Sequence, residues 1–131
     1  LLQNIDLAPT LLDLAGAATP PRMHGKSFVE ALANDGSSPN GWRDAVYYRY
    51  YESHGPHRVP KHDGVRTERW KLIWFPEVDP DGDGPRGIGC FELYDLENDP
   101  DERTSLADDP AYAEIQEKLE ARLVDLRKQY A

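Results

Sequence analysis

Three of the four histidines of this 131-residue chain lie in one short segment. They are His54, His57 and His62, and the same segment also holds Arg58 and Lys61. Imidazole and cationic side chains donate hydrogen bonds and attract negative charge, so this histidine segment could bind the oxygens of an anionic group. Glycine and proline interrupt the segment, which predicts a loop from residue 54 to residue 62.

Two other interpretations of the histidine segment remain open. One is a zinc site, but His57 and His62 lack the i, i+4 spacing of a helical zinc site and no cysteine lies nearby. The other is a solvent-exposed loop whose histidines bind nothing, because polar side chains are mostly solvated.

A second cluster of possible ligands lies in an aspartate-rich loop. Asp79, Asp81, Asp83 and Gly84 copy positions 1, 3, 5 and 6 of an EF-hand calcium loop. Position 12 is Cys90 instead of the bidentate glutamate, and no helices flank the loop. A hairpin connection rich in turn-forming residues is therefore the preferred interpretation, and Cys90 is interpreted as a structural thiol.

Two arginines follow the histidine segment. Arg66 and Arg69 could reach an anionic group, whereas an ion pair with an acid such as Glu52 or Asp63 is the simpler expectation for Arg66. These residues lie in a stretch rich in β-branched and aromatic side chains.

The elements that would position these residues include several strands. Residues 44–52, 65–75 and 91–94 are rich in β-branched and aromatic residues, which predicts strands. The segment from Pro76 to Gly89 would connect the last two as a long hairpin loop. An antiparallel sheet is therefore expected.

The clearest helix is at the C-terminal end. Asp109 is the expected N-cap and Pro110 the first helical residue. Apolar residues recur at steps of three and four to form one continuous stripe, and they are Tyr112, Ile115, Leu119, Leu123, Leu126 and Tyr130. This helix is expected to pack across the sheet.

Two shorter helices are expected before the sheet, over residues 6–15 and 26–34. Asp6 is the expected N-cap of the first and Gly16 its C-cap. Its apolar face is almost entirely leucine, which indicates a surface that packs on a domain outside this chain.

Five motifs, in this order along the chain, resemble the C-terminal part of a type I sulfatase. They are the Asp6-Leu-Ala-Pro-Thr helix, Met23-x-Gly-Lys-Ser, Gly64-Val-Arg-Thr, Leu93-Tyr-Asp-Leu and the last helix. The resemblance implies a hydrolase of sulfate esters with an alkaline-phosphatase-like fold. It also implies a formylglycine, made from a Cys/Ser-x-Pro-x-Arg motif, beside a calcium ion.

This chain lacks that nucleophile motif. Cys90 is followed by Phe-Glu-Leu-Tyr, and Ser38 is followed by Pro-Asn-Gly. The chain alone is therefore expected to be inactive, with no cofactor of its own. The formylglycine and calcium would belong to the parent enzyme, and the main partner would be the missing N-terminal catalytic domain.

The resemblance also implies a role for the histidine segment. In similar sulfatases this region approaches the mouth of the active site and can contact the substrate, a sulfated small molecule or sugar. We carry this role over to His57 and His62, with His54 and Arg58 as second choices. A periplasmic, secreted or lysosome-like compartment follows from the family resemblance only.

Charge and length restrict the function further. The net charge is −9, although residues 43–74 carry +3. The acidic whole argues against binding nucleic acid through bulk electrostatics, while the basic stretch could face an anionic substrate. No apolar run reaches the roughly 20 residues that would cross a bilayer. The sequence starts at Leu1 without a methionine, and we expect the protein's N-terminus to lie upstream.

The sequence thus predicts an α+β fold: an antiparallel sheet of about four strands, packed against a long C-terminal helix. Residues 1–36 would be the tail of the catalytic domain with a linker, and residues 37–131 a sulfatase C-terminal subdomain. This subdomain would complete the fold and line the substrate cleft. The alternative is a free-standing structural or interaction domain with no catalytic parent.

Overall fold

The computed structural model describes residues 1–52, 59–76 and 89–130. The chain divides into two units, Leu1–Asp44 and Ala45–Ala131. The Asp79–Gly84 loop lies outside the described residues.

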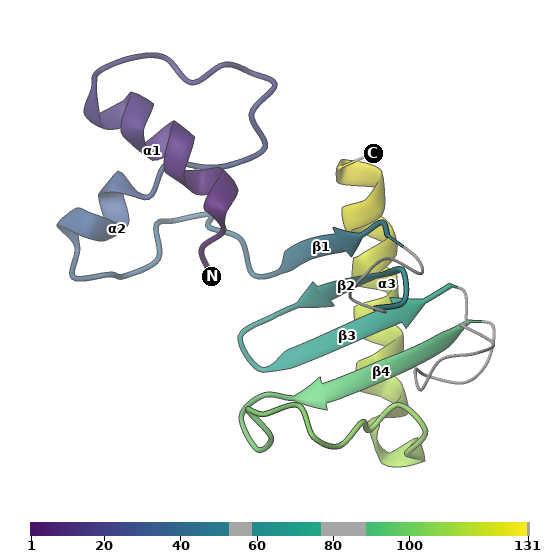
Figure 1. Ribbon diagram of the computed structural model, residues 1–131. Coiled ribbons are helices and arrows are strands. Elements are labelled where there is room, and N and C mark those ends of the chain that lie inside the picture. The colour runs from purple at the N-terminus through teal and green to yellow at the C-terminus, as the bar shows by residue number, and fades with distance from the viewer. Residues whose placement is uncertain (53–58, 77–88, 131) are drawn as a thin grey trace. The chain divides into compact units, whose positions relative to one another are not determined.

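The first unit contains a 3-10 turn and two short helices. These elements are η1 (Asn4–Asp6), α1 (Leu7–Leu14) and α2 (Val29–Ala33), shown in purple and blue in Figure 1. The prediction for residues 6–15 is confirmed to within a residue at each end, and Gly16 follows the helix with φ +68°. The helix predicted over residues 26–34 is real but shorter.

Asp6 organises the first unit through its side chain. The carboxylate is fully buried and pairs with the guanidinium of Arg43, whose Nη2 lies 2.6 Å from Oδ1. The backbone N–H groups of Lys26 and Gln3 donate to it at 2.9 and 2.8 Å. Asp6 occupies the N-cap position, but its side chain does not cap α1. The predicted capping role was wrong because the carboxylate instead holds Arg43, 37 residues later.

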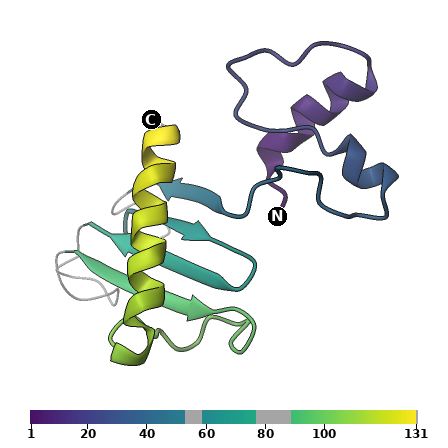
Figure 2. The ribbon, with the colours of Figure 1, turned by 180° about the vertical axis from the view of Figure 1, so that it is seen from behind.

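The second unit is a four-stranded antiparallel sheet with one long helix. The strands are β1 (Val46–Tyr50), β2 (His62–Arg66), β3 (Trp70–Phe75) and β4 (Cys90–Asp95), in the spatial order β1-β2-β3-β4. A 3-10 turn, η2 (Pro110–Tyr112), leads into α3 (Ala113–Gln129). Figures 1 and 2 show α3 crossing one face of the sheet. The predicted α+β fold is confirmed.

The core lies between the sheet and α3. Because side chains alternate along a strand, every second residue of β2, β3 and β4 faces the helix. The buried residues in this layer are Ala45, Val65, Leu72, Leu93, Leu119, Leu123 and Leu126. Burying each leucine contributes about 1.5–3 kcal/mol. The predicted apolar stripe is therefore the inner face of α3. Asp109 accepts a hydrogen bond from Ala111 N at 2.9 Å and so caps η2, the 3-10 turn that leads into α3.

The segment from residue 65 to residue 75, which was predicted as one strand, forms two. Thr67 N–H donates to the carbonyl of Trp70 at 2.8 Å, and Trp70 N–H donates to Thr67 Oγ1 at 2.9 Å. These bonds close a tight turn between β2 and β3. The short-range side-chain bond of Thr67 competes with a continuous strand at this point.

Candidate functional site

A small basic cleft lies in the second unit, where β1 ends and β2 begins. Its volume is about 250 Å³. It is lined by Arg49, Lys61, His62, Asp63, Trp74, Pro76 and Arg127. These residues come from three strands, their flanking segments and α3. Two of them, Lys61 and His62, belong to the histidine segment that the sequence indicated.

His62 is the first residue of β2 and pairs with Tyr50 of β1. The loop predicted over residues 54–62 therefore ends earlier than expected. The His62 ring lies between the rings of Tyr50 and Phe75, at centroid distances of 5.5 and 5.3 Å. This aromatic packing and the pairing with Tyr50 extend the strand to His62.

The imidazole of His62 has a defined orientation. Nδ1 lies 2.8 Å from the carbonyl oxygen of Pro60. Because a carbonyl oxygen only accepts hydrogen bonds, Nδ1 carries the hydrogen. Nε2 is then the ring nitrogen that is left to interact with a ligand, and it can donate a hydrogen bond when the ring is charged.

Asp63 is the acidic residue of the cleft, and its charge is balanced within the protein. Arg127 Nε and Nη2 donate to its two oxygens at 2.7 Å each, and Tyr47 Oη donates at 3.2 Å. These bonds to Asp63 raise the pKa of Arg127. The pKa of Tyr47 is also raised, by burial first and then by the Asp63 charge. Of the two acids expected to pair with Arg66, Asp63 is instead bound by Arg127 of α3.

Arg49 and Lys61 give the cleft its positive character. Arg49 of β1 lies opposite Asp63 of β2 in the strand register. Its guanidinium carbon lies 4.7 Å from the centre of the Tyr51 ring. With Arg127, three cations and one carboxylate line the cleft. Such a lining attracts anions.

The other predicted site residues, His54, His57 and Arg58, lie outside the described residues. They remain predictions. Arg49 and Arg127 were not predicted as site residues. Arg127 gave no local signal, since it contacts Asp63 from 64 residues away in the sequence. For Arg49, the available signal was its position directly opposite Asp63 in an antiparallel pair.

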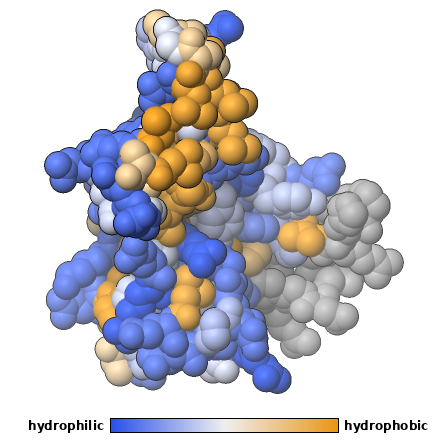
Figure 3. Space-filling view, turned by 90° about the vertical axis from the view of Figure 1, so that its left-hand side faces the viewer, coloured by the Kyte–Doolittle hydropathy of each residue, from blue (hydrophilic) through white to orange (hydrophobic). Residues whose placement is uncertain are grey.

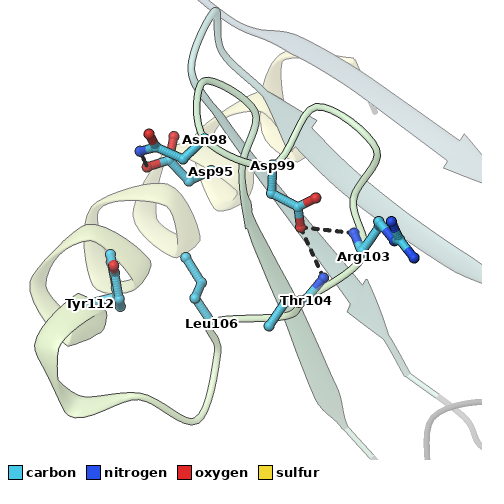
Figure 4. Close-up of a pocket in the computed structure, with 7 residues that line it drawn as sticks. All are labelled: Asp95, Asn98, Asp99, Arg103, Thr104, Leu106 and Tyr112. Atoms are coloured by element: carbon cyan, nitrogen blue, oxygen red, sulfur yellow. Dashed lines mark hydrogen bonds between the residues drawn. The ribbon is translucent and has the colours of Figure 1, made fainter.

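A larger pocket, of about 780 Å³, lies at the other end of the strands near η2. Figure 4 shows its lining residues, which are Asp95, Asn98, Asp99, Arg103, Thr104, Leu106 and Tyr112. The Asp99 carboxylate accepts from the backbone N–H groups of Arg103 and Thr104 at 2.8 and 2.9 Å. Asn98 Nδ2 donates to Asp95 at 2.8 Å. Both carboxylates are thus used to build a turn, which makes this pocket structural.

Asp95 is further fixed by Arg69, which donates to it at 3.0 and 2.8 Å. These bonds, with those from Asn98 and Glu97 N, outweigh the opposing effect of burial and lower the pKa of Asp95 to about 2. Arg69 is therefore committed to the turn and is not part of the basic cleft.

The described residues do not fit a metal ion or a formylglycine. Among residues 1–52, 59–76 and 89–130, no three His, Cys, Asp or Glu side chains are grouped so that they could hold a metal. The Cys90 thiol packs against Ile73, Phe75 and Tyr94, and its pKa is raised, mainly by burial. A thiol with a raised pKa is a poor nucleophile.

Comparison with known proteins identifies the family to which this chain belongs. Residues 1–129 match the family model described as N-sulphoglucosamine sulphohydrolase, C-terminal. The chain is a sulfatase C-terminal domain. This finding confirms the predicted family and favours the subdomain over the free-standing alternative.

Individual relatives agree with this assignment. The chain is 39% identical to an N-acetylglucosamine-6-O-sulfatase of Bacteroides thetaiotaomicron, over 97% of this chain and 21% of that protein. It is 34% identical to a Delta 4,5-hexuronate-2-O-sulfatase of the same organism, over 93% of this chain and 23% of that protein. A solved structure in complex with its substrate D-glucosamine-2-N,6-O-disulfate superposes with a TM-score of 0.84, at 39% identity, covering 95% of this chain and 24% of that one.

This sulfatase C-terminal domain thus spans between a fifth and a quarter of the length of the relatives it matches. In the part of the chain that the structure describes, no helix combines the length and the apolar character needed to cross a bilayer.

Proposed function

We propose that the whole protein is a sulfatase acting on a sulfated amino sugar and that this domain forms one wall of its substrate cleft. The observation that carries this proposal is the basic cleft at the edge of the sheet, which Arg49, Lys61 and His62 help to line. The relatives support the substrate class, since one is named an N-acetylglucosamine-6-O-sulfatase and another is bound to a glucosamine disulfate.

In this proposal the domain binds and orients the substrate and does not attack it. A sulfated sugar offers further oxygens beyond its reacting sulfate group, and these accept hydrogen bonds from cations and from a charged imidazole. His62 would supply such a donor through Nε2. His57 is proposed as its neighbour in this role, with His54 and Arg58 as further contacts from the same segment.

The formylglycine and the calcium ion are proposed to belong to the part of the protein that precedes this domain. Sulfatases generally use both groups. The donor set described here fits neither group, because Cys90 has no Pro or Arg at the required offsets and is half-buried against apolar side chains. When bound, the metal and formylglycine would supply the nucleophilic chemistry.

The catalytic part is also the proposed partner of the leucine face of α1. Leu7, Leu11 and Leu14 are 55%, 66% and 62% exposed, and Leu2 and Ile5 are exposed beside them. Figure 3 shows apolar side chains gathered in one orange area over the first unit. An apolar area of this kind marks an interaction surface. The occupant proposed here is the preceding part of the same polypeptide, because the relatives are four to five times longer than the matched region.

The direct test compares the full-length protein with residues 1–131 alone. Both are assayed on glucosamine 6-sulfate and on an aryl sulfate, with the corresponding phosphate ester as a second substrate class. We expect turnover of sulfate esters by the full-length protein and none by this domain. Turnover by the isolated domain, or a full-length protein active only on the phosphate ester, would contradict the proposal.

A further inference from the structure

Asn40 and Gly41 form the tip of a turn in the first unit. The N–H of Trp42 donates to the carbonyl oxygen of Pro39 at 3.0 Å and closes the turn, and both residues at the tip are exposed. Gly41 has a φ of +70°, as the third residue of a type II turn requires. The turn therefore presents to solvent the only asparagine of the chain that is followed by a glycine.

The two groups at this tip that could react with each other are not hydrogen-bonded. Among residues 1–52, 59–76 and 89–130, neither the side-chain amide of Asn40 nor the N–H of Gly41 has a hydrogen-bond partner. Because Gly41 lacks a Cβ atom, another group can approach its backbone nitrogen closely. Both the nitrogen and the neighbouring amide carbon are thus available for reaction.

Asn98 lies in a turn of the second unit and offers a contrast within the same chain. It is exposed as well, but its Nδ2 donates to Asp95 at 2.8 Å. The N–H of the following residue, Asp99, donates to the carbonyl oxygen of Asp95 at 2.7 Å. The amide and the adjacent backbone nitrogen are both held by hydrogen bonds, which makes Asn98 an internal control for Asn40.

We propose that Asn40 is a site of spontaneous deamidation, with water as the co-reactant. The nitrogen of Gly41 attacks Cγ of Asn40, the Cγ–Nδ2 bond breaks, and Nδ2 takes the proton of the N–H group and leaves as ammonia. Water then opens the cyclic imide. Cleavage of the bond between the nitrogen and Cγ gives aspartate, whereas cleavage at the backbone carbonyl carbon gives isoaspartate, which adds an extra carbon to the main chain.

Isoaspartate at position 40 would disturb the contacts that organise the first unit. The lengthened chain would break the turn that precedes Arg43, whose guanidinium pairs with the buried carboxylate of Asp6. It would also displace the carbonyl of Gly41, which accepts a hydrogen bond from Lys26 Nζ at 3.1 Å. Since the N–H of Lys26 donates to Asp6, the reaction affects the Asp6 carboxylate through two of its partners.

The test follows the full-length protein during warm storage at mildly alkaline pH, which favours loss of the Gly41 N–H proton. Peptide mass spectrometry identifies aspartate and isoaspartate at each asparagine. We expect both products at position 40 to accumulate several times faster than at Asn98. Conversion at Asn40 that is no faster than at Asn98 would overturn the proposal.

Hydrogen exchange then measures the effect of the reaction on the first unit. The readout is the protection of the backbone N–H groups of Gln3 and Lys26, which donate to Asp6. Stored wild type should lose protection there, while stored Asn40→Ser should keep it. Freshly prepared Asn40→Asp, which adds the charge without the extra carbon, should also keep it. Equal protection in stored and fresh wild type, despite isoaspartate at position 40, would overturn the proposed effect on the fold.

Discussion

Arg127, near the end of α3, donates two hydrogen bonds of 2.7 Å to the carboxylate of Asp63 in β2. Beside this pair, the rings of Tyr47 and Tyr130 stack at a centroid distance of 6.1 Å. The same contact therefore fixes the end of α3 to the sheet and compensates the acidic charge of the basic cleft. The stability of the domain and the charge balance of the cleft are linked at this point.

Removing Arg127 should leave the buried Asp63 carboxylate with the weaker hydrogen bond from Tyr47. We expect Arg127→Met to lower the free energy of unfolding of the domain by about 1–3 kcal/mol, measured by urea unfolding. The double variant Asp63→Leu/Arg127→Met should recover part of this loss, because it also removes the buried charge. Strictly additive effects of the two substitutions would contradict the coupling.

Because Gly64 has no side chain, the Tyr48 ring can occupy the space beside its Cα atom. A Cβ at Gly64 would lie 2.5 Å from Tyr48 Oη and 2.6 Å from the carbonyl oxygen of Leu72. Since the carbonyl belongs to the sheet backbone, it cannot move aside easily. Gly64→Ala should therefore destabilise the domain by about 1–3 kcal/mol. An unchanged urea midpoint would show that β2 and β3 adjust without cost.

The hydrogen bonds of Asp95 in its turn should make the stability of the domain depend on pH. Hydrogen bonds from Arg69 and Asn98, opposed by burial, lower the pKa of Asp95 from an ordinary value of 3.8 to about 2. Because the folded state prefers the ionised form, this stabilisation is present above about pH 4 and is lost as the pH falls toward 2. Wild type should thus lose stability more steeply than Asp95→Asn in this interval. Parallel curves for the two proteins would argue against the assignment.

The leucine face of α1 can be tested in the full-length protein. If Leu11 packs against the catalytic part, Leu11→Asp buries an unpaired carboxylate there and should cost about 2–5 kcal/mol. Val124→Asp is the matched control, since Val124 is a 43% exposed apolar residue of α3. We expect a lower Tm and easier proteolysis for Leu11→Asp only. Similar behaviour of both variants would contradict the proposal that the leucine face of α1 packs against the catalytic part.

Local patterns in the sequence were enough to predict the fold of the second unit. The stripe from Leu119 to Leu126 encodes one buried face, and packing it against buried strand residues such as Val65 and Leu72 gives a sheet covered by a helix. The split between β2 and β3 was missed, because the turn depends on one hydroxyl, that of Thr67.

The candidate site was only partly predictable, because its partners come from distant parts of the chain. Nothing near Asp63 indicates Arg127, and nothing near Asp6 indicates Arg43. In both cases the tertiary structure brings a distant arginine next to a buried carboxylate. The histidine segment was found because its residues are close in sequence, and His62 does line the cleft.

The central claim is that this domain contacts the sugar substrate through His62. The most direct measurement is kcat/KM of the full-length protein with His62→Phe, which keeps a ring between Tyr50 and Phe75 but removes the hydrogen-bonding nitrogens. Tyr50→Phe is the control. We predict a loss of roughly tenfold to a hundredfold on glucosamine 6-sulfate and little change on an aryl sulfate, which extends less far from the reacting sulfur. Unchanged kinetics of His62→Phe on the sugar sulfate would contradict the account.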